Sequence, residues 1–399
     1  MILKLNKNYI IIFFAFLILS GFLYAIPASN YAFAKLFSMV AVVLFFLYGN
    51  KNIAKLGKNN TYINYCYLFT IITIVIAIYS FLVYDETILQ VFNICGEFFG
   101  ILFYIVLLMM KVDKEKVEDI FINVTLLIVI AFFVQYFIYL NTDRIFFIDF
   151  ENPRMRAGFF RVGVGENFVG ISVVILFGRL ISKYEFEHVI SKKFILEIAL
   201  FLYYYCMYIC TRAGLVAIGA AIVMMVLMGT NKKRLKIFMI LVIIVSLYFI
   251  INSSIFEKYL IVDKIEGGGS IYGRINAYKY YFEHFLQYPF LGNGFLYPDS
   301  YETKLLLYGP AGHYYLDDVG VIGFIFTTGI AGLLWLIGLA IKVLKNIVIM
   351  YKSKVLYKNP EVIGVLAYIV VTMPTLFICS YGKICFLPIL LYILTPSKK

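Results

Sequence analysis

Charged residues are scarce in this chain of 399 residues: they make up 15% of it, against about 25% in soluble domains. Hydrophobic residues make up 63%, and a single soluble core cannot bury that much apolar surface. A soluble enzyme is therefore excluded, and the sequence predicts an integral membrane protein.

Cysteine and histidine are also rare, with six and three residues. No cysteine pair stands in an expected loop and no metal-type spacing appears, so neither disulfides nor a metal site is expected. Cys206 and Cys210 lie four residues apart, which favours packing on one helix face over ligation. The cysteines fall in or at the ends of apolar stretches: Cys66, Cys95, Cys206, Cys210, Cys379 and Cys385.

Three further patterns are missing from the sequence. There is no glycine-rich phosphate loop and no acidic metal cluster, so neither a nucleotide nor a metal cofactor is expected. There is no internal repeat either, which argues against a transporter built from two similar halves.

Apolar stretches of the kind that cross a bilayer recur along the whole chain. We predict an all-α, polytopic fold, a single transmembrane domain over 1–399 with about twelve spans and ten or eleven as alternatives. The first stretch is interpreted as a membrane anchor rather than a signal peptide, because its apolar run is long. The predicted spans are 8–27, 31–48, 62–83, 88–110, 120–140, 166–182, 194–210, 213–229, 235–252, 319–341, 361–379 and 383–395.

The net charge of +12 divides unevenly across these spans. With the N-terminus placed in the cytoplasm, the inner loops carry 22 of the 35 Lys and Arg residues and the outer loops carry 11. The inner side is then +15 and the outer side −3, as the positive-inside rule requires. The excess charge indicates cytoplasmic termini rather than a nucleic-acid partner.

Two expected extracytoplasmic loops, 141–165 and 253–318, are long enough to be functional. In the larger loop, 266–270 is glycine-rich, and 275–287 is rich in aromatic residues with polar residues interspersed. We expect the latter to form a short amphipathic helix on the membrane surface, ended by a turn at 289–295.

Arginine is concentrated on the outer side: six of the eight arginines lie there, whereas the inner side uses almost only lysine. A planar guanidinium suits phosphate recognition better than an ammonium does. The arginines therefore predict a phosphate-binding site at the outer membrane surface, and snorkelling to lipid headgroups is the alternative. The five that carry this prediction are Arg154, Arg156, Arg161, Arg212 and Arg274.

His313 lies near the same surface and is followed by Asp317 and Asp318, about one helical turn further on. A histidine with a carboxylate one turn away is a candidate general base. The alternative is an interfacial histidine beside solvated acids.

Two carboxyls, Glu97 and Glu197, lie inside predicted spans, where a charge is costly. They are expected to be neutral, to face a cavity, or to pair with Lys35 or Arg179.

Four segments, in the same order and with similar loop sizes, resemble motifs of the O-antigen polymerase and O-antigen ligase superfamily. ThrArgAlaGlyLeu, from 211, resembles its Ser-Arg-Ser-Gly-Leu hairpin, and ArgAlaGlyPhe at 156–159 with GluAsn at 166–167 resembles an earlier Arg-x-x-Gly-x-Phe…Pro-Asn stretch.

The other two segments lie in the larger loop. GlyArgIleAsnAlaTyr, from 273, with TyrProPheLeuGlyAsnGlyPhe at 288–295 resembles the Arg-led helix and glycine turn of the family. His313 with AspValGlyValIleGly at 318–323 resembles its His-Asn-x…Glu-x-Gly segment. The chain departs from the family at Tyr314, where the family has Asn, and at Glu166, where the ligases tend to have Pro.

The resemblance implies a metal-independent glycosyltransferase on the outer face of the cytoplasmic membrane, acting on glycans linked to undecaprenyl diphosphate. It implies that Arg212 and Arg274 stabilise the diphosphate and that His313 is the base, with Asp317 or Asp318 as orienter or substitute. The expected binding residues are Arg154, Arg156, Arg161, Glu166 and Asn167.

A repeat-unit polymerase of lipopolysaccharide or capsule is favoured over a ligase to lipid A–core, because the composition is idiosyncratic. A chain-length regulator and a flippase are its expected partners, beside the bilayer. A flippase or transporter of lipid-linked oligosaccharide and a structural membrane partner are the alternatives of other classes.

Overall fold

The structure is a computed structural model that describes residues 7–21, 32–49, 62–144, 154–156, 159–161, 164–233, 236–237, 240, 269–310 and 312–396. The predicted span 235–252 and the first part of the large loop fall almost wholly outside these residues.

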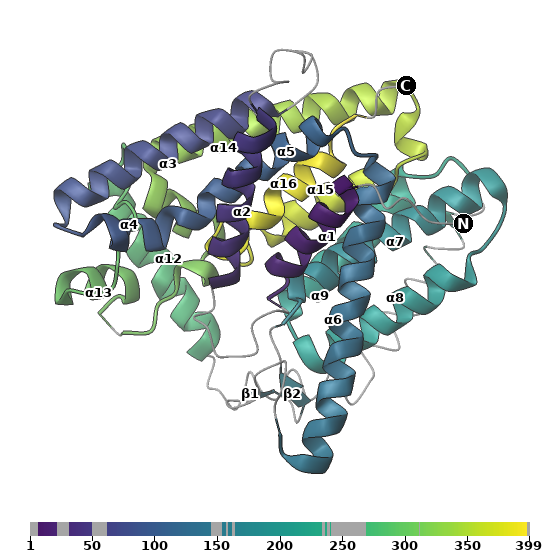
Figure 1. Cartoon of the computed structure of the whole chain (residues 1–399), viewed down its shortest axis with the longest axis horizontal. Helices are drawn as coiled ribbons and strands as arrows, with labels where there is room; N and C mark the ends of the chain where they lie inside the picture. The colour runs from purple at the N-terminus through teal and green to yellow at the C-terminus, as the bar shows by residue number, and fades with distance from the viewer. Residues whose placement is uncertain are drawn as a thin grey trace.

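The described chain is predominantly helical (Figure 1). Five helical stretches are long and apolar enough to cross a membrane: Ile63–Val83 (α3), Ile88–Met110 (α4, η2 and α5), Lys114–Thr142 (α6), Glu166–Glu187 (α7) and Gly320–Lys352 (α14). The shorter helices are α1 (Lys7–Leu19), α2 (Ala32–Gly49), α8 (Lys192–Tyr204), η3 (Tyr205–Ile209), α9 (Arg212–Met228), α12 (Gly269–Gln287), α13 (Tyr301–Tyr308), η4 (Leu316–Asp318), η5 (Val355–Tyr357), α15 (Glu361–Thr372), η6 (Ile384–Phe386) and α16 (Leu387–Ile393). The prediction of an all-α membrane protein is confirmed in this broad form, and the count of twelve spans stays a prediction.

The structure differs from the predicted elements in two places. Arg154–Arg156 (β1) and Phe159–Arg161 (β2) pair as a short antiparallel hairpin, which the sequence did not predict. The predicted span 361–379 ends early, because α15 stops at Thr372 and turns follow over 373–383. Pro374, which cannot continue a helix interior, lies two residues beyond that end.

Helix α3 shows why the sequence predicts a membrane protein. Its buried residues recur every three or four positions and form one narrow stripe: Cys66, Phe69, Thr73, Ile76 and Ser80. The opposite face is also apolar, with Ile71, Ile78 and Leu82 more than half exposed. A helix that is apolar all round and buried along only one stripe requires lipid on its other side.

Helix α14 packs against α3 and is interrupted at Gly329 (φ 62°, ψ −158°). Only glycine adopts such a conformation without strain. At the break, the N–H of Ile330 donates to the carbonyl of Pro289 at 2.7 Å instead of continuing the helical pattern. The turn that follows α12 is therefore joined to the middle of a membrane helix.

The turn at 289–295 satisfies the carbonyls that the break leaves open. Asn293 and Gly294 donate their N–H groups to Phe326 and Thr327 at 2.7 and 3.1 Å. The second half of the turn is buried, since Asn293 and Phe295 are both 0% exposed, whereas Phe290 in its first half is 78% exposed. The second half of the turn, within the predicted loop 253–318, thus lies inside the bundle.

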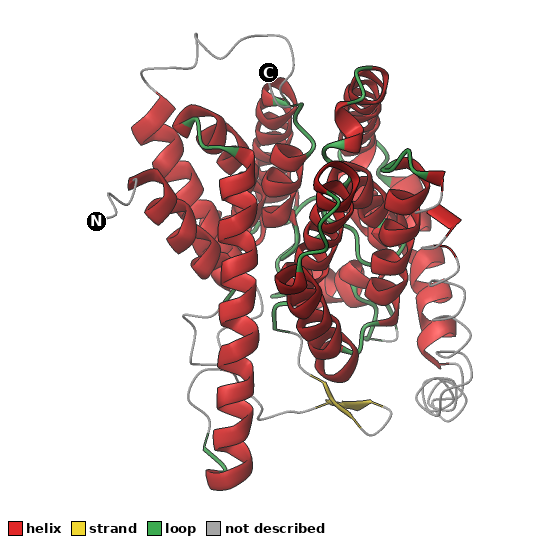
Figure 2. Cartoon of the chain, turned by 90° about the vertical axis from the view of Figure 1, so that its right-hand side faces the viewer, coloured by secondary structure: helices red, strands yellow, loops and turns green. Residues whose placement is uncertain are grey.

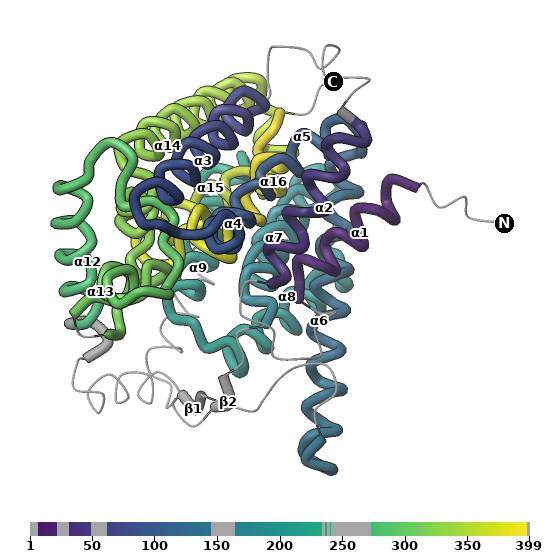
Figure 3. Tube along the Cα trace, turned by 60° about the vertical axis from the view of Figure 1, so that its left-hand side comes forward, coloured from purple at the N-terminus to yellow at the C-terminus, as the bar shows by residue number. Residues whose placement is uncertain are grey.

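The elements that carry the predicted site residues lie toward one end of the bundle. That end, here called the site end, contains the β1–β2 hairpin, α12 and α13, away from the C-terminus (Figures 1 and 3). Helix α6 has 29 residues, about 43 Å at 1.5 Å per residue, and runs toward the hairpin (Figure 2).

Candidate functional site

Arg212 is placed at the site end by a sharp change of chain direction. The π-helix η3 ends at Cys210, whose φ of 54° is left-handed, and α9 starts at Arg212 after an extended Thr211. The half-buried Arg212 therefore stands at a helix N-terminus, where the helix dipole favours negative charge.

Tyr205 of η3 joins this helix start to α7. Its hydroxyl donates to Glu166 Oε1 at 3.4 Å. The same hydroxyl lies against Gly214, since a Cβ there would come within 1.7 Å of it. Glu166 is the first residue of α7, preceded by Gly165 in the left-handed region (φ 77°), and Asn167 beside it is half-buried.

The hairpin brings the other predicted arginines toward the same place. In its register Arg154 stands opposite Arg161, and Arg156 stands opposite Phe159. The backbone of β2 lies beside η3. The three arginine positions of the hairpin and the start of α9 are thus neighbours, although more than 50 residues separate them in sequence.

A second group forms where α12 meets η4. Burial raises the pKa of the Tyr278 hydroxyl, the guanidinium of Arg274 opposes the rise, and the carboxylate of Asp318 adds to it. Arg274 and Asp318 therefore both lie within electrostatic range of Tyr278. One turn further along α12, burial raises the pKa of Tyr281, and Asp317 is among the charges that add to this shift.

His313 lies outside any helix. It is exposed and lies in an extended stretch, since Tyr315 has φ −128° and ψ 127° and the 3₁₀ helix η4 begins only at Leu316. Its ring is 5.8 Å from that of Tyr314. The chain between His313 and Asp317 is therefore not a helical turn, and the pairing of His313 with Asp317 or Asp318 stays a prediction.

Helix α15 and the turns after it connect the residues around Glu166 and Arg212 with the residues around Arg274. At one end, Tyr368 packs against α7, where a Cβ on Gly170 would lie 2.9 Å from its hydroxyl. At the other end, the carbonyl of Pro374 accepts the Tyr278 hydroxyl, and that of Met373 accepts the N–H of Val321 at 2.9 Å. One helix thus fixes the Glu166 region relative to the Arg274 region.

The structure contradicts the predicted pairing of Arg179 with Glu97 or Glu197. Arg179 donates to Glu118 Oε2 at 3.0 Å, to Asp119 Oδ1 at 2.6 Å and to the carbonyl of Glu115 at 2.9 Å, all on α6. These contacts lie near the start of α6, away from the site end, so Arg179 joins α7 to α6.

The two carboxyls within predicted spans have different partners. Glu197 pairs with Lys193 on its own helix at 3.6 Å. Glu97 accepts the N–H of Gly382 at 2.8 Å and lies within electrostatic range of Lys35, one of the two partners predicted for it.

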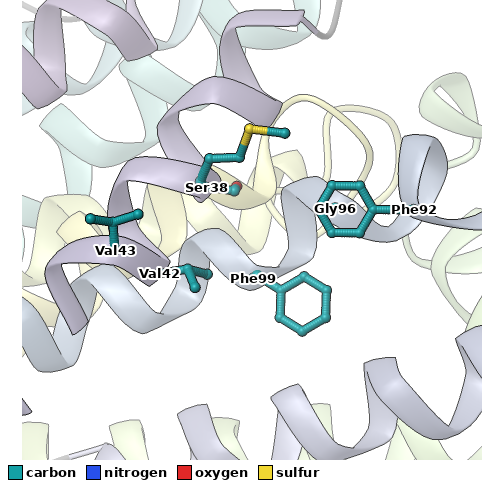
Figure 4. Close-up of a pocket in the computed structure, with 7 residues that line it drawn as sticks. Ser38, Val42, Val43, Phe92, Gly96 and Phe99 are labelled. Atoms are coloured by element: carbon teal, nitrogen blue, oxygen red, sulfur yellow. The ribbon is translucent and has the colours of Figure 1, made fainter. Parts of the chain in front are cut away.

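A pocket of about 290 Å³ lies between α2 and the α4–η2 segment (Figure 4). Its lining is almost entirely apolar, so it suits hydrocarbon rather than a sugar or a phosphate. The lining residues are Ser38, Met39, Val42, Val43, Phe92, Gly96 and Phe99.

Among the described residues, no group of three or more His, Cys, Asp or Glu side chains is arranged to hold a metal ion. Tyr205, Tyr278 and the segment 373–383 were missed by sequence reasoning. Tyr278 lies in the quoted segment from 273 but was given no role, and the places of all three depend on contacts between distant helices.

A family model described as O-antigen ligase matches residues 198–337. The match covers 140 of the 399 residues and supports the resemblance to the O-antigen polymerase and ligase superfamily, whose members are glycosyltransferase-like enzymes. Together with the apolar helices, it indicates a membrane protein. The matched range includes Arg212, Arg274 and His313 and begins after the hairpin and Glu166. No curated protein matches the chain.

Proposed function

We propose that the protein is a polymerase that transfers a growing glycan from undecaprenyl diphosphate to a new lipid-linked repeat unit. The observation that carries this proposal is the position of two arginines within the matched family range. Arg212 opens α9 beside the Tyr205–Glu166 contact, and Arg274 lies with Tyr278 and Asp318. Both stand at the same end of an apolar bundle.

The proposed reaction is a displacement at the anomeric carbon of the donor glycan. The acceptor hydroxyl loses its proton to a base while its oxygen bonds to that carbon. The bond from the carbon to the diphosphate oxygen breaks, and its electron pair leaves with the diphosphate. Fixed positive charge is most effective where the negative charge develops, so Arg212 and Arg274 act on the leaving group.

Asp317 is the base that the geometry favours, because it lies near Tyr281 of α12, one turn beyond the Arg274 group. Asp318 lies within electrostatic range of Tyr278 and orients the acceptor side of the site. His313, which is exposed, remains the alternative base. The hairpin arginines, Glu166 and Asn167 bind the glycan or the diphosphate.

In the proposed topology, the site end faces the outside of the cytoplasmic membrane, both termini are cytoplasmic, and the chain crosses about twelve times. Reporter fusions after Thr142 and after Tyr308 should report an extracytoplasmic position. A fusion after Ser353 should report a cytoplasmic one, and the reverse pattern would overturn the orientation.

The activity test uses purified protein in liposomes with synthetic repeat units on undecaprenyl diphosphate and no nucleotide sugar. Wild-type protein should lengthen the glycan, as measured by gel or mass spectrometry. Removing one charge-stabilising donor slows comparable reactions by about 10²–10³-fold, so Arg212→Ala and Arg274→Ala should each reduce the rate on that order. Lysine keeps the positive charge but lacks the planar guanidinium, so Arg212→Lys and Arg274→Lys should each retain only part of the wild-type rate.

Arg144 supplies the matched control. It is an exposed arginine at the end of α6 and belongs to neither group. Arg144→Ala should elongate glycans at the wild-type rate. Unchanged chain lengths in both Arg212→Ala and Arg274→Ala would remove the basis of the proposal.

An O-antigen ligase activity is the second candidate, because the matching family model carries that description. Adding lipid A–core to the liposomes distinguishes a ligase from a polymerase. A ligase transfers glycan to lipid A–core and leaves repeat units alone, whereas a polymerase lengthens them without it. Movement of intact lipid-linked glycan across the membrane without any new glycosidic bond would instead indicate a flippase.

A further inference from the structure

The pocket between α2 and the α4–η2 segment is a groove that opens at the surface of the bundle (Figure 4). Three of its lining side chains, Met39, Val43 and Phe92, are 46%, 57% and 42% exposed. The helices that carry them are apolar, so the phase around the groove is the hydrocarbon of the bilayer. Lipid chains reach such a groove, whereas water-soluble ligands do not.

Contacts between α2 and η2 (Gly96–Leu102) fix the floor of the groove. Ser38 is 1% exposed, and its hydroxyl donates to the carbonyl of Glu97 at 2.8 Å. The two segments approach closely here, since a Cβ on Gly100 would lie 2.9 Å from Ser38 Oγ. The hydroxyl is thus engaged with the backbone, and the surface offered to an occupant is apolar.

Gly96 provides the space within the groove. It is the first residue of η2, and a Cβ there would meet the ring of Phe92 at 3.6 Å, an ordinary van der Waals distance. A side chain larger than a methyl group would extend into the groove. The shape therefore depends on a glycine in one wall and on the fixed floor.

The wall formed by α4 (Ile88–Cys95) is joined to the site end. Gln90 Nε2 donates to Asp299 Oδ2 at 2.8 Å, and Glu86 accepts the N–H of Tyr297. Tyr297 and Asp299 lie between α12 and α13, two helices of the site end. The start of α4 is therefore held at the site end by two hydrogen bonds.

The groove begins a short way below that end. With a rise of 1.5 Å per residue in α4 and about 2 Å in η2, Phe92 and Phe99 stand roughly 6 and 18 Å from Ile88 along the segment. The hydrocarbon core of a bilayer is about 30 Å thick. In the proposed topology, the groove thus extends from near the outer surface to about the middle of the membrane.

We propose that this groove binds the polyprenyl chain of the lipid-linked glycan while the arginines of the site end hold its diphosphate. This inference rests on the proposed function, which supplies the donor. The depth of the groove matches the leaflet in which the chain of that donor lies. The rings of Phe92 and Phe99 and the thioether of Met39 give a branched, unsaturated chain a polarisable surface.

The attachment of the chain to a bound headgroup selects it over the acyl chains of the bilayer. A chain that moves from lipid into the groove gains packing contacts and no hydrophobic free energy. A phospholipid chain therefore gains little there. The polyprenyl chain of a donor whose diphosphate is already bound has a high effective concentration at the groove, because its binding is then intramolecular.

The kinetic test compares two tryptophan substitutions on α2. Val43 lines the groove, whereas Leu47, one turn further along, is 71% exposed and does not line it. Val43→Trp should raise the KM for a full-length undecaprenyl donor by roughly three- to tenfold, because many weak atom contacts are lost together. It should leave the KM for a geranyl-linked donor and both kcat values unchanged. Leu47→Trp should match wild type with both donors.

Gly96→Leu fills the groove from the opposite wall and should repeat the effect of Val43→Trp. A KM that rises equally for the long and the short donor in these variants would show general damage to the site and overturn the proposal. So would a wild-type KM for the long donor in both variants.

Photolabelling tests the groove without any enzymatic activity. Undecaprenyl phosphate with a diazirine on its chain should label the segments 38–43 and 92–99 in nanodiscs, as mapped by mass spectrometry. Excess undecaprenyl diphosphate should abolish the labelling, and excess phosphatidylglycerol should not. Val43→Trp should lose it and Leu47→Trp should keep it.

The two proposals can fail separately. Labelling without any glycan elongation would contradict the polymerase and leave the groove as a polyprenyl site. Elongation by a protein that is not labelled in the groove would overturn the inference and leave the polymerase. Equal competition by phosphatidylglycerol would also overturn it, since the groove would then hold an ordinary acyl chain.

Discussion

Substitution of Gly329 by alanine tests whether the break in α14 depends on the turn at 289–295. A Cβ at this position would lie 2.4 Å from the carbonyl oxygen of Phe290 and 2.4 Å from the amide nitrogen of Gly292. Both are backbone atoms, so no side-chain rotation relieves the clash, and the turn must move out of the break.

The expected loss of stability has two parts. Holding alanine at φ 62° and ψ −158° costs about 1–3 kcal/mol. Displacing the turn breaks the hydrogen bonds from Asn293 to Phe326 and from Ile330 to Pro289, each of which contributes about 0.5–1.5 kcal/mol. Gly329→Ala should therefore lower the free energy of unfolding by about 2–6 kcal/mol.

The assay is unfolding of the purified protein in mixed micelles by increasing fractions of denaturing detergent, followed by tryptophan fluorescence. Trp335, the single tryptophan, lies six residues from the break and is 2% exposed. Gly219→Ala is the control, because a Cβ there meets nothing within 4 Å and the position is inside a helix. Equal stability of Gly329→Ala and Gly219→Ala would refute the reasoning.

Three further predictions use the same preparations. Arg179→Ala should lower the free energy of unfolding by roughly 3–5 kcal/mol, because it leaves the buried carboxylate of Glu118 without its main partner, while Arg179→Lys should lose less. Burial lowers the pKa of His284 below its ordinary 6.5, so the unfolded chain takes up a proton there before the folded chain does. Thermal stability should therefore fall as the pH drops through about 6.5, and His284→Gln should reduce this fall; identical pH dependence in both would contradict it. Gly214→Ala should displace the Tyr205 hydroxyl from Glu166 and reduce both stability and elongation. Adding Tyr205→Phe, which removes the clashing hydroxyl, should restore stability but not elongation, and a lack of any such rescue would argue against this contact.

Much of the helical framework was predictable, because each helix that faces lipid must be apolar over its own length. The predicted span 62–83 and the helix α3 agree almost to the residue. Helix α12 and the turn after it were also predictable, because an aromatic-rich segment with interspersed polar residues and a glycine cluster after it are local signals.

The site was predictable only in part. Arg212 starts α9, as its local motif predicts, whereas Arg274 is the sixth residue of α12, and both lie at one end of the bundle. The pairing of His313 with Asp317 or Asp318 stays a prediction, because the chain between them is not helical and their spacing alone does not fix their contact. The early end of α15 was missed because the residues after Thr372 are as apolar as those before it.

By itself, the sequence determined that this chain lies in a membrane, since this property follows from the composition of single segments. Only the tertiary structure decided which residues work together. Glu97 receives its hydrogen bond from Gly382, 285 residues away, and Tyr278 meets the carbonyl of Pro374 across 96 residues. Such contacts depend on how helices pack and where they break, and no local pattern encodes them.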